Sequence, residues 1–358
     1  MSYAIAAAGT GGHVYPGLAV GEALVESGVA REDVLFMGGS RLEATVYPEA
    51  GFPFLEVELR GLQRRLTTAN LGIPGVVRRA VRRMHEALME RGVQVVLGMG
   101  GYVTIPAALA ARRAGARLMV AEQNAEAGLA NRLAARMAGR VFVSFPNTEG
   151  LRGEWVGNPV RSAIARFDRV ALRPRALARY GLDADPPIVG VFGGSLGAAA
   201  LNDAAVSVFT AWDGPPIQVL HLAGPSHRAE VAARAETANL AWVVLDYELH
   251  MEDFYAAVDL VVARAGGAVA ELTATGTPAI LVPGSFGSGD HQQANAAALA
   301  SCGAALVVPE PDLPGLGRRL AELVGDTDML VSMRAATSTL SRPEAAGVIA
   351  AAMVDAHG

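Results

Sequence analysis

The sequence predicts an α/β protein made of two similar halves, each built on a parallel β-sheet. Short apolar runs alternate with longer segments of helical periodicity along the chain, which is typical of strands joined by crossover helices. Each half opens with an apolar run, a glycine-rich loop and a helix, at AIAAAGTGGHVYP and VGVFGGSLGAAALN. These repeats indicate two tandem Rossmann-like domains facing a central cleft, because ligands of open parallel sheets gather at the strand carboxyl ends.

Six strands are expected in each half, with helical patterns between most of them. The candidates of the first half are 3–7, 34–37, 54–57, 93–97, 117–120 and 141–143, and those of the second are 188–192, 218–221, 242–245, 260–263, 279–282 and 305–308. Turn residues from Trp155 to Arg161 interrupt this rhythm and mark a boundary, which predicts domains at 1–160 and 161–341. The alanine-rich end of the chain predicts a helix within 342–358 that packs back on the first domain.

The composition excludes several classes of protein. A chain of 358 residues with 51% apolar and 18% charged residues has enough apolar sequence for two cores and is not disordered. All 30 basic residues are arginine, so Schiff-base enzymes, Walker-type NTPases and kinases, which need a lysine, are excluded. The single cysteine, Cys302, cannot form an internal disulfide or a cysteine zinc cluster, which fits the cytoplasm.

Charge and hydropathy predict a soluble or peripheral protein that binds no nucleic acid. The formal net charge of -5 gives no basic field for DNA or RNA. The N-terminus has no basic region of a signal peptide, and no apolar stretch approaches the roughly 18 residues needed to span a bilayer.

The first glycine loop, Gly9-Thr10-Gly11-Gly12-His13, directly follows the first strand. Its small residues let a substrate approach the backbone, and the amides at the helix start can donate to anionic oxygens. The dinucleotide fingerprint G-x-G-x-x-G fails because Val14 occupies its third glycine position, so NAD binding is not expected. His13 is the candidate general base for an incoming hydroxyl, and the alternative interpretation is a helix cap or core histidine.

The second glycine loop, Gly193-Gly194-Ser195-Leu196-Gly197, is expected to bind phosphate, with Ser195 adding a hydroxyl to the backbone donors. The same residues match the G-x-S-x-G spacing of a nucleophilic serine, so a hydrolase remains an alternative on this motif alone. The parallel loop in the first half favours the phosphate interpretation.

Three further polar clusters follow strands or open helices. Glu122-Gln123-Asn124 follows one strand, and Arg264-Ala265-Gly266-Gly267 precedes a helix with Glu271, where helix-start donors suit a diphosphate and a carboxylate suits ribose hydroxyls. Asp290-His291-Gln292-Gln293 opens a later helix and suits a polyhydroxylated sugar, or else Asp290 is a simple N-cap. The only close Asp-x-Asp pairs lie in turn-like contexts, so no metal site is expected.

A basic and apolar segment at 62–84 is a candidate for binding an anionic membrane surface. Its arginine stripe, Arg78, Arg79, Arg82 and Arg83, lies beside an apolar helix face, and it follows a segment that mixes the same residue types: Leu62, Arg64, Arg65, Leu66, Leu71 and Ile73. An ordinary solvated helix is the alternative.

Over nearly its whole length the chain resembles the MurG family of glycosyltransferases of peptidoglycan synthesis, of glycosyltransferase family 28 type. The resemblance rests on AGTGGHVYPGLAV, LGMGGYVTIPAALAA, EQNAEAGLANRLA, VGNPVR, GGSLGAAALN and DHQQANA, in that order. It implies the two-domain GT-B fold and transfer of N-acetylglucosamine from UDP-GlcNAc to the muramyl 4-hydroxyl of lipid I, with anomeric inversion, to give lipid II. It also implies a peripheral enzyme on the cytoplasmic face of the cell membrane that requires no cofactor.

The resemblance also assigns roles to residues. His13 and Glu122 would be catalytic, and Thr10, His13, Tyr102, Glu122 and Asn131 would bind the acceptor. The donor-binding residues would be Thr10, Gly11, Gly12, Asn124, Arg161, Ser195, Tyr247, Glu248, Gly266, Gly267, Ala268, Glu271, Gln292 and Gln293. The stretch from Arg264 to Glu271 is one residue shorter than is usual in the family. Alternatives are a related UDP-sugar enzyme, such as a non-hydrolysing epimerase or a transferase acting on another lipid or a secondary metabolite, and a nucleotide-sugar or lipid sensor without turnover.

Overall fold

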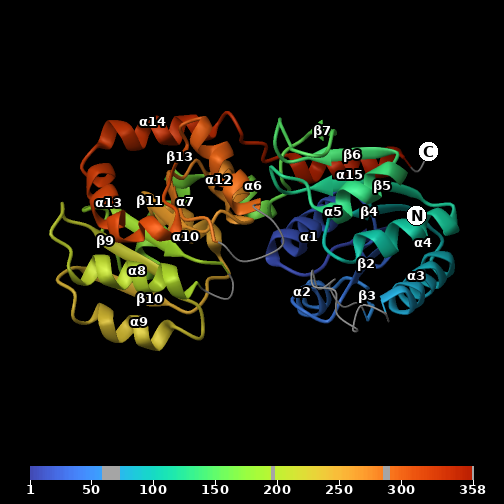
Figure 1. Ribbon diagram of the computed structural model, residues 1–358, viewed down its shortest axis with the longest axis horizontal. Coiled ribbons are helices and arrows are strands. Elements are labelled where there is room, and N and C mark those ends of the chain that lie inside the picture. The colour runs from blue at the N-terminus through green and yellow to red at the C-terminus, as the bar shows by residue number, and fades with distance from the viewer. Residues whose placement is uncertain (59–72, 195–197, 285–290, 357–358) are drawn as a thin grey trace. The chain divides into compact units, whose positions relative to one another are not determined.

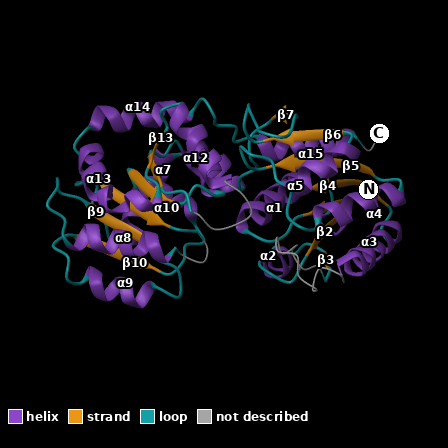
Figure 2. Ribbon diagram, in the orientation of Figure 1, coloured by secondary structure: helices purple, strands orange, loops and turns teal. Residues whose placement is uncertain are grey.

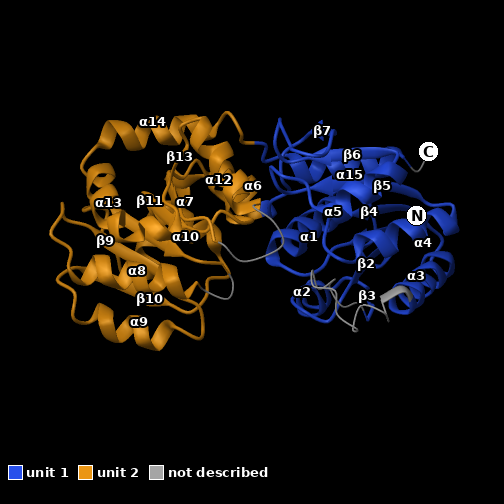
Figure 3. Ribbon diagram, in the orientation of Figure 1, with its two compact units in different colours: residues 1–162, 342–358 blue, residues 163–341 orange. Residues whose placement is uncertain are grey.

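The computed structural model describes residues 1–58, 73–194, 198–284 and 291–356. The chain forms two compact units, residues 1–162 with 342–358 and residues 163–341, which are coloured separately in Figure 3. Each unit is an α/β domain with one parallel sheet, so the predicted fold class is confirmed. Figure 2 shows helices on both faces of each sheet.

Unit 1 has a seven-stranded sheet in the order β3-β2-β1-β4-β5-β6-β7 (Figure 1). Its strands are β1 (Ser2–Ala6), β2 (Val34–Gly38), β3 (Phe54–Glu56), β4 (Val93–Gly98), β5 (Arg117–Glu122), β6 (Arg140–Val143) and β7 (Glu154–Trp155). Its helices are α1 (Gly11–Glu26), α2 (Glu43–Glu49), α3 (Ile73–Glu90), α4 (Thr104–Ala114), α5 (Leu129–Ala134) and α15 (Ala345–Asp355), with short 3₁₀ turns at Arg31–Asp33 and Ala135–Met137.

Alternating residues of the central strands bury the two faces of this sheet against different helices. Tyr3 and Ile5 of β1 share one cluster with α1 and α15, whereas Ala4 and Ala6 share the other with α3 and α4. This two-sided burial explains why the strands appear in the sequence as continuous apolar runs. Helix α15 packs on α1 through Ile349 and its neighbours, so the end of the chain belongs to unit 1.

Unit 2 has a six-stranded sheet in the order β10-β9-β8-β11-β12-β13. Its strands are β8 (Ile188–Phe192), β9 (Gln218–Leu222), β10 (Ala241–Leu245), β11 (Leu260–Ala263), β12 (Ala279–Leu281) and β13 (Ala305–Val307). Its helices are α7 (Arg169–Tyr180), α8 (Ala199–Thr210), α9 (Arg228–Ala235), α10 (Met251–Ala257), α11 (Ala268–Thr275), α12 (His291–Ser301), α13 (Leu316–Val324) and α14 (Thr327–Thr337), with a 3₁₀ segment at Glu310–Gly315; the short α6 (Ser162–Ala165) lies at the boundary between the units.

All twelve predicted strands are present, with ends that differ by two residues at most. Unit 1 has one strand more than the six expected, because Glu154 and Trp155 form the short strand β7 beside β6, whereas Trp155 was expected among the turn residues of the boundary. A strand of two residues shows no periodicity of its own, and its existence depends on the neighbouring strand.

The core of unit 2 contains a histidine that is held neutral. His221 on β9 is fully buried, its Nε2 atom lies 3.0 Å from Oδ1 of Asn202, and its ring stacks on Trp242. Burial lowers the pKa of His221 from 6.5 to about 3. The side chain is therefore part of the packing and not a group that titrates near neutral pH.

The lowered pKa of His221 is expected to make the folded protein less stable in acid. Below pH 6.5 the unfolded chain binds a proton that the folded unit does not, so stability is lost as the pH falls from about 6.5 towards 3. We expect His221 to contribute a slope of about 1.4 kcal/mol per pH unit in that window. Urea unfolding followed by tryptophan fluorescence at several pH values measures it. His221→Gln, which keeps a donor for Asn202, should remove this part of the slope, and an unchanged slope would contradict the assignment.

Candidate active site

The predicted residues of unit 1 follow three neighbouring strands at their carboxyl ends. In this sheet β1 lies between β2 and β4, and the strand order reverses between β1 and β4. The loops after such a pair of strands diverge to opposite faces and leave a crevice between them, which is where ligands of open α/β sheets bind. Thr10 and His13 follow β1, Tyr102 follows β4, and Glu122 ends β5 beside β4.

His13 lies in the first turn of α1, on the loop side of the sheet. Its Nδ1 atom lies 3.3 Å from Oγ1 of Thr10, the residue that precedes the helix. The Cδ2 and Nε2 edge of the ring faces Gly100, since a Cβ placed on that glycine would lie 2.5 Å from Cδ2 and 2.8 Å from Nε2. The contacts with Thr10 and Gly100 hold the imidazole across the crevice between the β1 and β4 loops.

Two glycines make this close approach possible. Gly100 and Gly101 have φ angles of +103° and +77°, a region that L-residues rarely adopt. A Cβ on Gly101 would overlap the carbonyl oxygen of Ala8 in the β1 loop. The loops after β1 and β4 therefore pack backbone against backbone.

Glu122 is buried, with 2% of its surface exposed, and its carboxylate organises the loop that follows it. One oxygen accepts hydrogen bonds from the backbone and side-chain amides of Asn124, at 2.9 and 3.0 Å. The other accepts from the Gly128 amide at 3.0 Å and the Asn131 side chain at 2.8 Å. With four donors engaged, this geometry favours a positioning role for Glu122 and Asn131 over direct contact with a reacting atom.

Glu122→Gln is expected to destabilise unit 1 by about 2 kcal/mol, because an amide nitrogen would replace an oxygen that accepts two N–H groups. Urea denaturation of the variant and of the wild type gives this difference. Glu126→Gln in the same loop is the control, and its stability should stay within about 0.5 kcal/mol of the wild type. Equal stability of both variants would contradict the positioning role.

Two further polar groups lie at this crevice, Gln123 from the predicted polar cluster and Glu43, which the sequence did not single out. The Oε1 atom of Gln123 is buried without a hydrogen-bond partner, and it faces the same side of Gly100 as His13. An unpartnered buried acceptor is costly, so this oxygen is suited to receive a hydroxyl of a ligand. Glu43 of α2 is fully buried beside Tyr102. A carboxylate four residues before the buried Tyr47, on the same helix face, was the signal that could have identified it.

Arg161, predicted to meet a diphosphate, belongs to unit 1 because that unit extends to residue 162. Its guanidinium lies over the ring of Tyr15, 5.7 Å from the centroid. The half-buried Glu22 on α1 has a raised pKa, mainly through burial, which the positive charges of Arg31 and Arg161 oppose.

In unit 2 the strand order reverses between β8 and β11, and one group of predicted donor residues follows β11. Gly266, Gly267 and Ala268 lead into α11, and Glu271 in its first turn accepts a hydrogen bond from the Tyr255 hydroxyl at 3.0 Å. The predicted polar loop also contained Arg264, which is 8% exposed and donates to Glu310 and to the Val282 carbonyl. Arg264 therefore has a structural role in linking β11 to its neighbours.

The segment after β10 combines an exposed ring with a fixed carboxylate. Tyr247 is 40% exposed, whereas Glu248 is 5% exposed. One oxygen of Glu248 accepts from Arg179 at 2.8 Å and from the His250 amide at 2.7 Å, and the other accepts from the Tyr180 hydroxyl at 2.7 Å. Helix α7 thus fixes the backbone of this segment, which suits recognition of a flat base through main-chain groups.

The remaining predicted donor residues lie near α12. Gln292 accepts a hydrogen bond from the Gly284 amide at 2.8 Å, and Gln293 is exposed. Asn295 is buried and donates to the Ala265 carbonyl at 3.0 Å, which joins α12 to the loop after β11. Ser195, Leu196, Gly197 and Asp290 lie outside the described residues. No group of three His, Cys, Asp or Glu side chains that could hold a metal occurs among the described residues.

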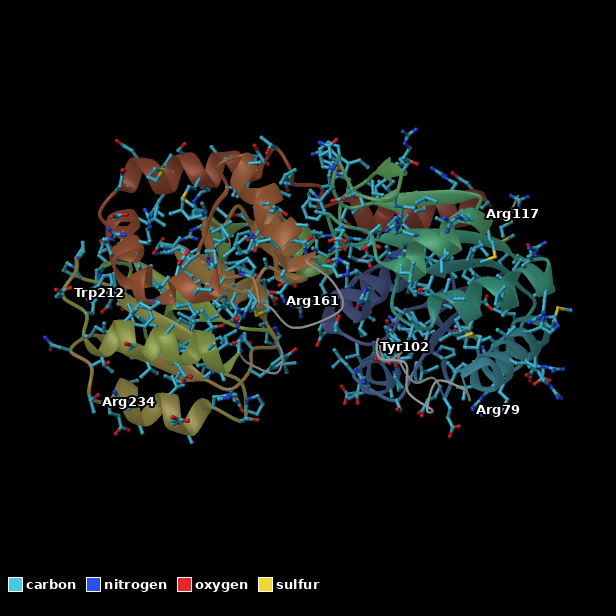
Figure 4. The ribbon with its side chains drawn as sticks, in the orientation of Figure 1. Arg79, Tyr102, Arg117, Arg161, Trp212 and Arg234 are labelled. Carbon is cyan, nitrogen blue, oxygen red and sulfur yellow. The ribbon has the colours of Figure 1, made fainter. Side chains whose placement is uncertain are left out.

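Helix α3 carries the described part of the predicted membrane segment. Arg78, Arg79, Arg82 and Arg83 are exposed, and Figure 4 shows Arg79 on the outer side of the unit. The apolar face of the helix is not available to lipid, because Val81, Met84 and Leu88 are buried in the unit 1 core. Residues 62–72 lie outside the described residues. No helix in the described ranges is long and apolar enough to cross a bilayer.

Comparison with known proteins identifies relatives of both units. The glycosyltransferase family 28 N-terminal domain matches residues 3–143 and its C-terminal domain matches residues 188–348. A protein of Halorhodospira halophila named UDP-N-acetylglucosamine--N-acetylmuramyl-(pentapeptide) pyrophosphoryl-undecaprenol N-acetylglucosamine transferase is 43% identical, over 99% of this chain and 98% of its own length. A protein of the same name from Nocardioides is 40% identical, over 95% and 94%. The crystal structure of Acinetobacter baumannii MurG matches with a TM-score of 0.81 and 27% identity, over 99% of this chain and 100% of that one.

Proposed function

The chain belongs to glycosyltransferase family 28, and from this premise we propose that it transfers N-acetylglucosamine from UDP-GlcNAc to lipid I, giving lipid II for peptidoglycan synthesis. The enzyme is then a hexosyltransferase whose substrates are a nucleotide sugar and a lipid-linked muramyl pentapeptide. The observation that carries the proposal is the 43% identity to a transferase with this name over 99% of the chain.

The proposed chemistry is a displacement with inversion. His13 takes the proton of the muramyl 4-hydroxyl, and that oxygen attacks the anomeric carbon from the face opposite UDP. The bond from the anomeric carbon to the β-phosphate oxygen breaks, and its electron pair leaves with UDP. The position of His13 at a helix start, between Thr10 and Gly100, supports this role.

The remaining groups bind and orient the two substrates. Thr10, Gly11, Gly12, Asn124 and Arg161 are the proposed donor contacts of unit 1. In unit 2, Ser195 and the residues that start α11 would bind the diphosphate, Glu271 the ribose, Tyr247 and Glu248 the uracil through backbone groups, and Gln292 and Gln293 the sugar. Helix-start amides and an arginine can neutralise the departing UDP, so we propose that no metal is required.

Transfer of radiolabelled N-acetylglucosamine to a short-chain lipid I analogue tests this function. We expect lipid II formation by the purified protein, unchanged by added chelator. Saturable UDP-GlcNAc binding without transfer would contradict it and favour another acceptor or a sensor. Release of UDP without acceptor, with inversion at another sugar carbon, would instead identify an epimerase.

We also propose that the enzyme works as a peripheral protein on the cytoplasmic face of the membrane, where the exposed arginines of α3 meet anionic headgroups. Each arginine near such a surface contributes about 1 kcal/mol. Arg79→Glu combined with Arg83→Glu is therefore expected to weaken binding to phosphatidylglycerol vesicles by about tenfold or more. Sedimentation with vesicles measures this. The matched control exchanges two exposed arginines of α9, Arg228 and Arg234, and an equal loss in that variant would refute a specific α3 surface.

A further inference from the structure

One buried carboxylate connects three loops at the carboxyl end of the unit 1 sheet. Glu43, the first residue of α2, is 0% exposed. One of its oxygens accepts a hydrogen bond from the Gly39 amide at 3.0 Å and one from the Tyr102 hydroxyl at 3.1 Å. Its other oxygen accepts from the Gly9 amide at 3.3 Å. Figure 4 shows Tyr102 beside α2.

These three donors come from the loops that follow β1, β2 and β4. A fully buried carboxylate is costly unless several donors satisfy it, and an apolar side chain would fill the same space without that cost. Within the described part of the chain, the donors to Glu43 are two backbone amides and a phenol of the crevice loops, not a basic side chain. The placement is therefore suited to holding loops together.

The phenol of Tyr102 has a fixed direction in this arrangement. Its hydrogen is donated to Glu43, so its oxygen can only accept a hydrogen bond from a ligand. A Cβ on Gly39 would overlap the Tyr102 hydroxyl, so the ring lies directly against the backbone of that glycine. Burial and the neighbouring Glu43 charge raise the pKa of Tyr102 to about 12, which keeps the phenol un-ionised at neutral pH.

We propose that Glu43 is a positioning residue for the acceptor: it joins the loops at Gly9, Gly39 and Tyr102, and it turns the Tyr102 oxygen into an acceptor for a hydroxyl or amide N–H of the sugar-peptide substrate. The Tyr102 oxygen therefore selects a substrate group that can donate a hydrogen bond. This inference rests on the proposed transfer reaction and adds a residue that acts through Tyr102.

Steady-state kinetics of four proteins test the role: wild type, Glu43→Gln, Tyr102→Phe and the double variant. UDP-GlcNAc and a short-chain lipid I analogue are the substrates, and calorimetry measures UDP binding. We expect each single change to raise the KM for the lipid I analogue about tenfold and to leave the Kd of UDP within about twofold. The KM of the double variant for the lipid I analogue should be no higher than that of the more impaired single variant, because both changes break the same connection between Glu43 and Tyr102. Glu49→Gln, at an exposed position of the same helix, is the control and should behave as wild type.

Amide hydrogen exchange adds a readout that does not depend on turnover. Glu43→Gln should speed exchange at Gly9 and Gly39 at least tenfold, with the core strands unchanged. Additive kinetic effects, an unchanged KM for the lipid I analogue, or unchanged exchange at both glycines would overturn the proposal. If Glu43→Gln does not fold, Tyr102→Phe decides alone, because an unchanged acceptor KM in that variant excludes the role. Absence of transfer by the wild type would instead overturn the proposed function, and the exchange result would still test the loop connection.

Discussion

Replacing His13 with alanine is expected to lower kcat about a thousandfold while the Kd of UDP changes by less than about twofold. The imidazole lies in the crevice of the unit 1 sheet, held by Thr10 at Nδ1 and facing Gly100 with its other edge. Removing it takes away the proposed base without changing the groups of unit 2 that are proposed to bind the nucleotide. Single-turnover transfer to a lipid I analogue and calorimetry with UDP give the two quantities.

The matched control for this experiment is His85→Ala, which changes a half-buried histidine on α3 of the same unit, outside the crevice. Its kcat should stay within about twofold of the wild-type value. A proportional loss of turnover and UDP binding in His13→Ala would contradict the role of base. So would a variant that retains more than about a tenth of the wild-type rate.

Gly100→Ala is expected to have the second largest effect, with a fall in kcat of about a hundredfold. A Cβ at this position would lie 2.5 Å from Cδ2 and 2.8 Å from Nε2 of His13, so the ring must move out of the crevice. The backbone also has a φ of +103°, where a side chain adds about 1–3 kcal/mol of strain. Transfer kinetics and thermal unfolding separate the loss of activity from the loss of stability.

Gly115→Ala is the control for the strain that a side chain adds to a backbone with a positive φ. Gly115 ends α4 with a φ of +71°, and a Cβ there would meet nothing within 4 Å. It should lose about 1 kcal/mol of stability and keep its activity. If both glycine variants lose activity in parallel, the displacement of His13 is not the cause.

Most of the fold could be predicted from the sequence because its signals are local. A strand covered on both faces must be apolar throughout, and a crossover helix has its own period, so the order of elements is visible in the chain. Two parallel halves with glycine loops then placed Thr10 and His13 at a strand carboxyl end, and the family resemblance added Tyr102. Glu154 and Trp155 were the exception, because their pairing with β6 depends on a neighbour.

The roles of the charged residues could not be predicted in the same way. The resemblance assigned Glu122 a catalytic role, and the fold surrounds its carboxylate with four donors from the loop and helix that follow it. Arg264 lies in a loop whose helix-start donors were expected to suit a diphosphate, and its own side chain pairs with Glu310, 46 residues away. The apolar face of α3 was expected to support membrane binding, but Val81, Met84 and Leu88 face the core. In each case the outcome depends on which partner the fold brings close.

The sequence by itself determined the two-domain α/β class, the succession of strands along the chain and the loops that carry the candidate site, because periodicity, glycine spacing and strand ends are properties of neighbouring residues. Only the tertiary structure decided which side chains are exposed to a ligand and which are committed to the protein. Glu43, Tyr102 and Gly9 are far apart in the chain, and their contact arises from the parallel packing of β1, β2 and β4. Hydrogen bonds form over about 3 Å, so such a connection exists only once the sheet has brought its strand ends together.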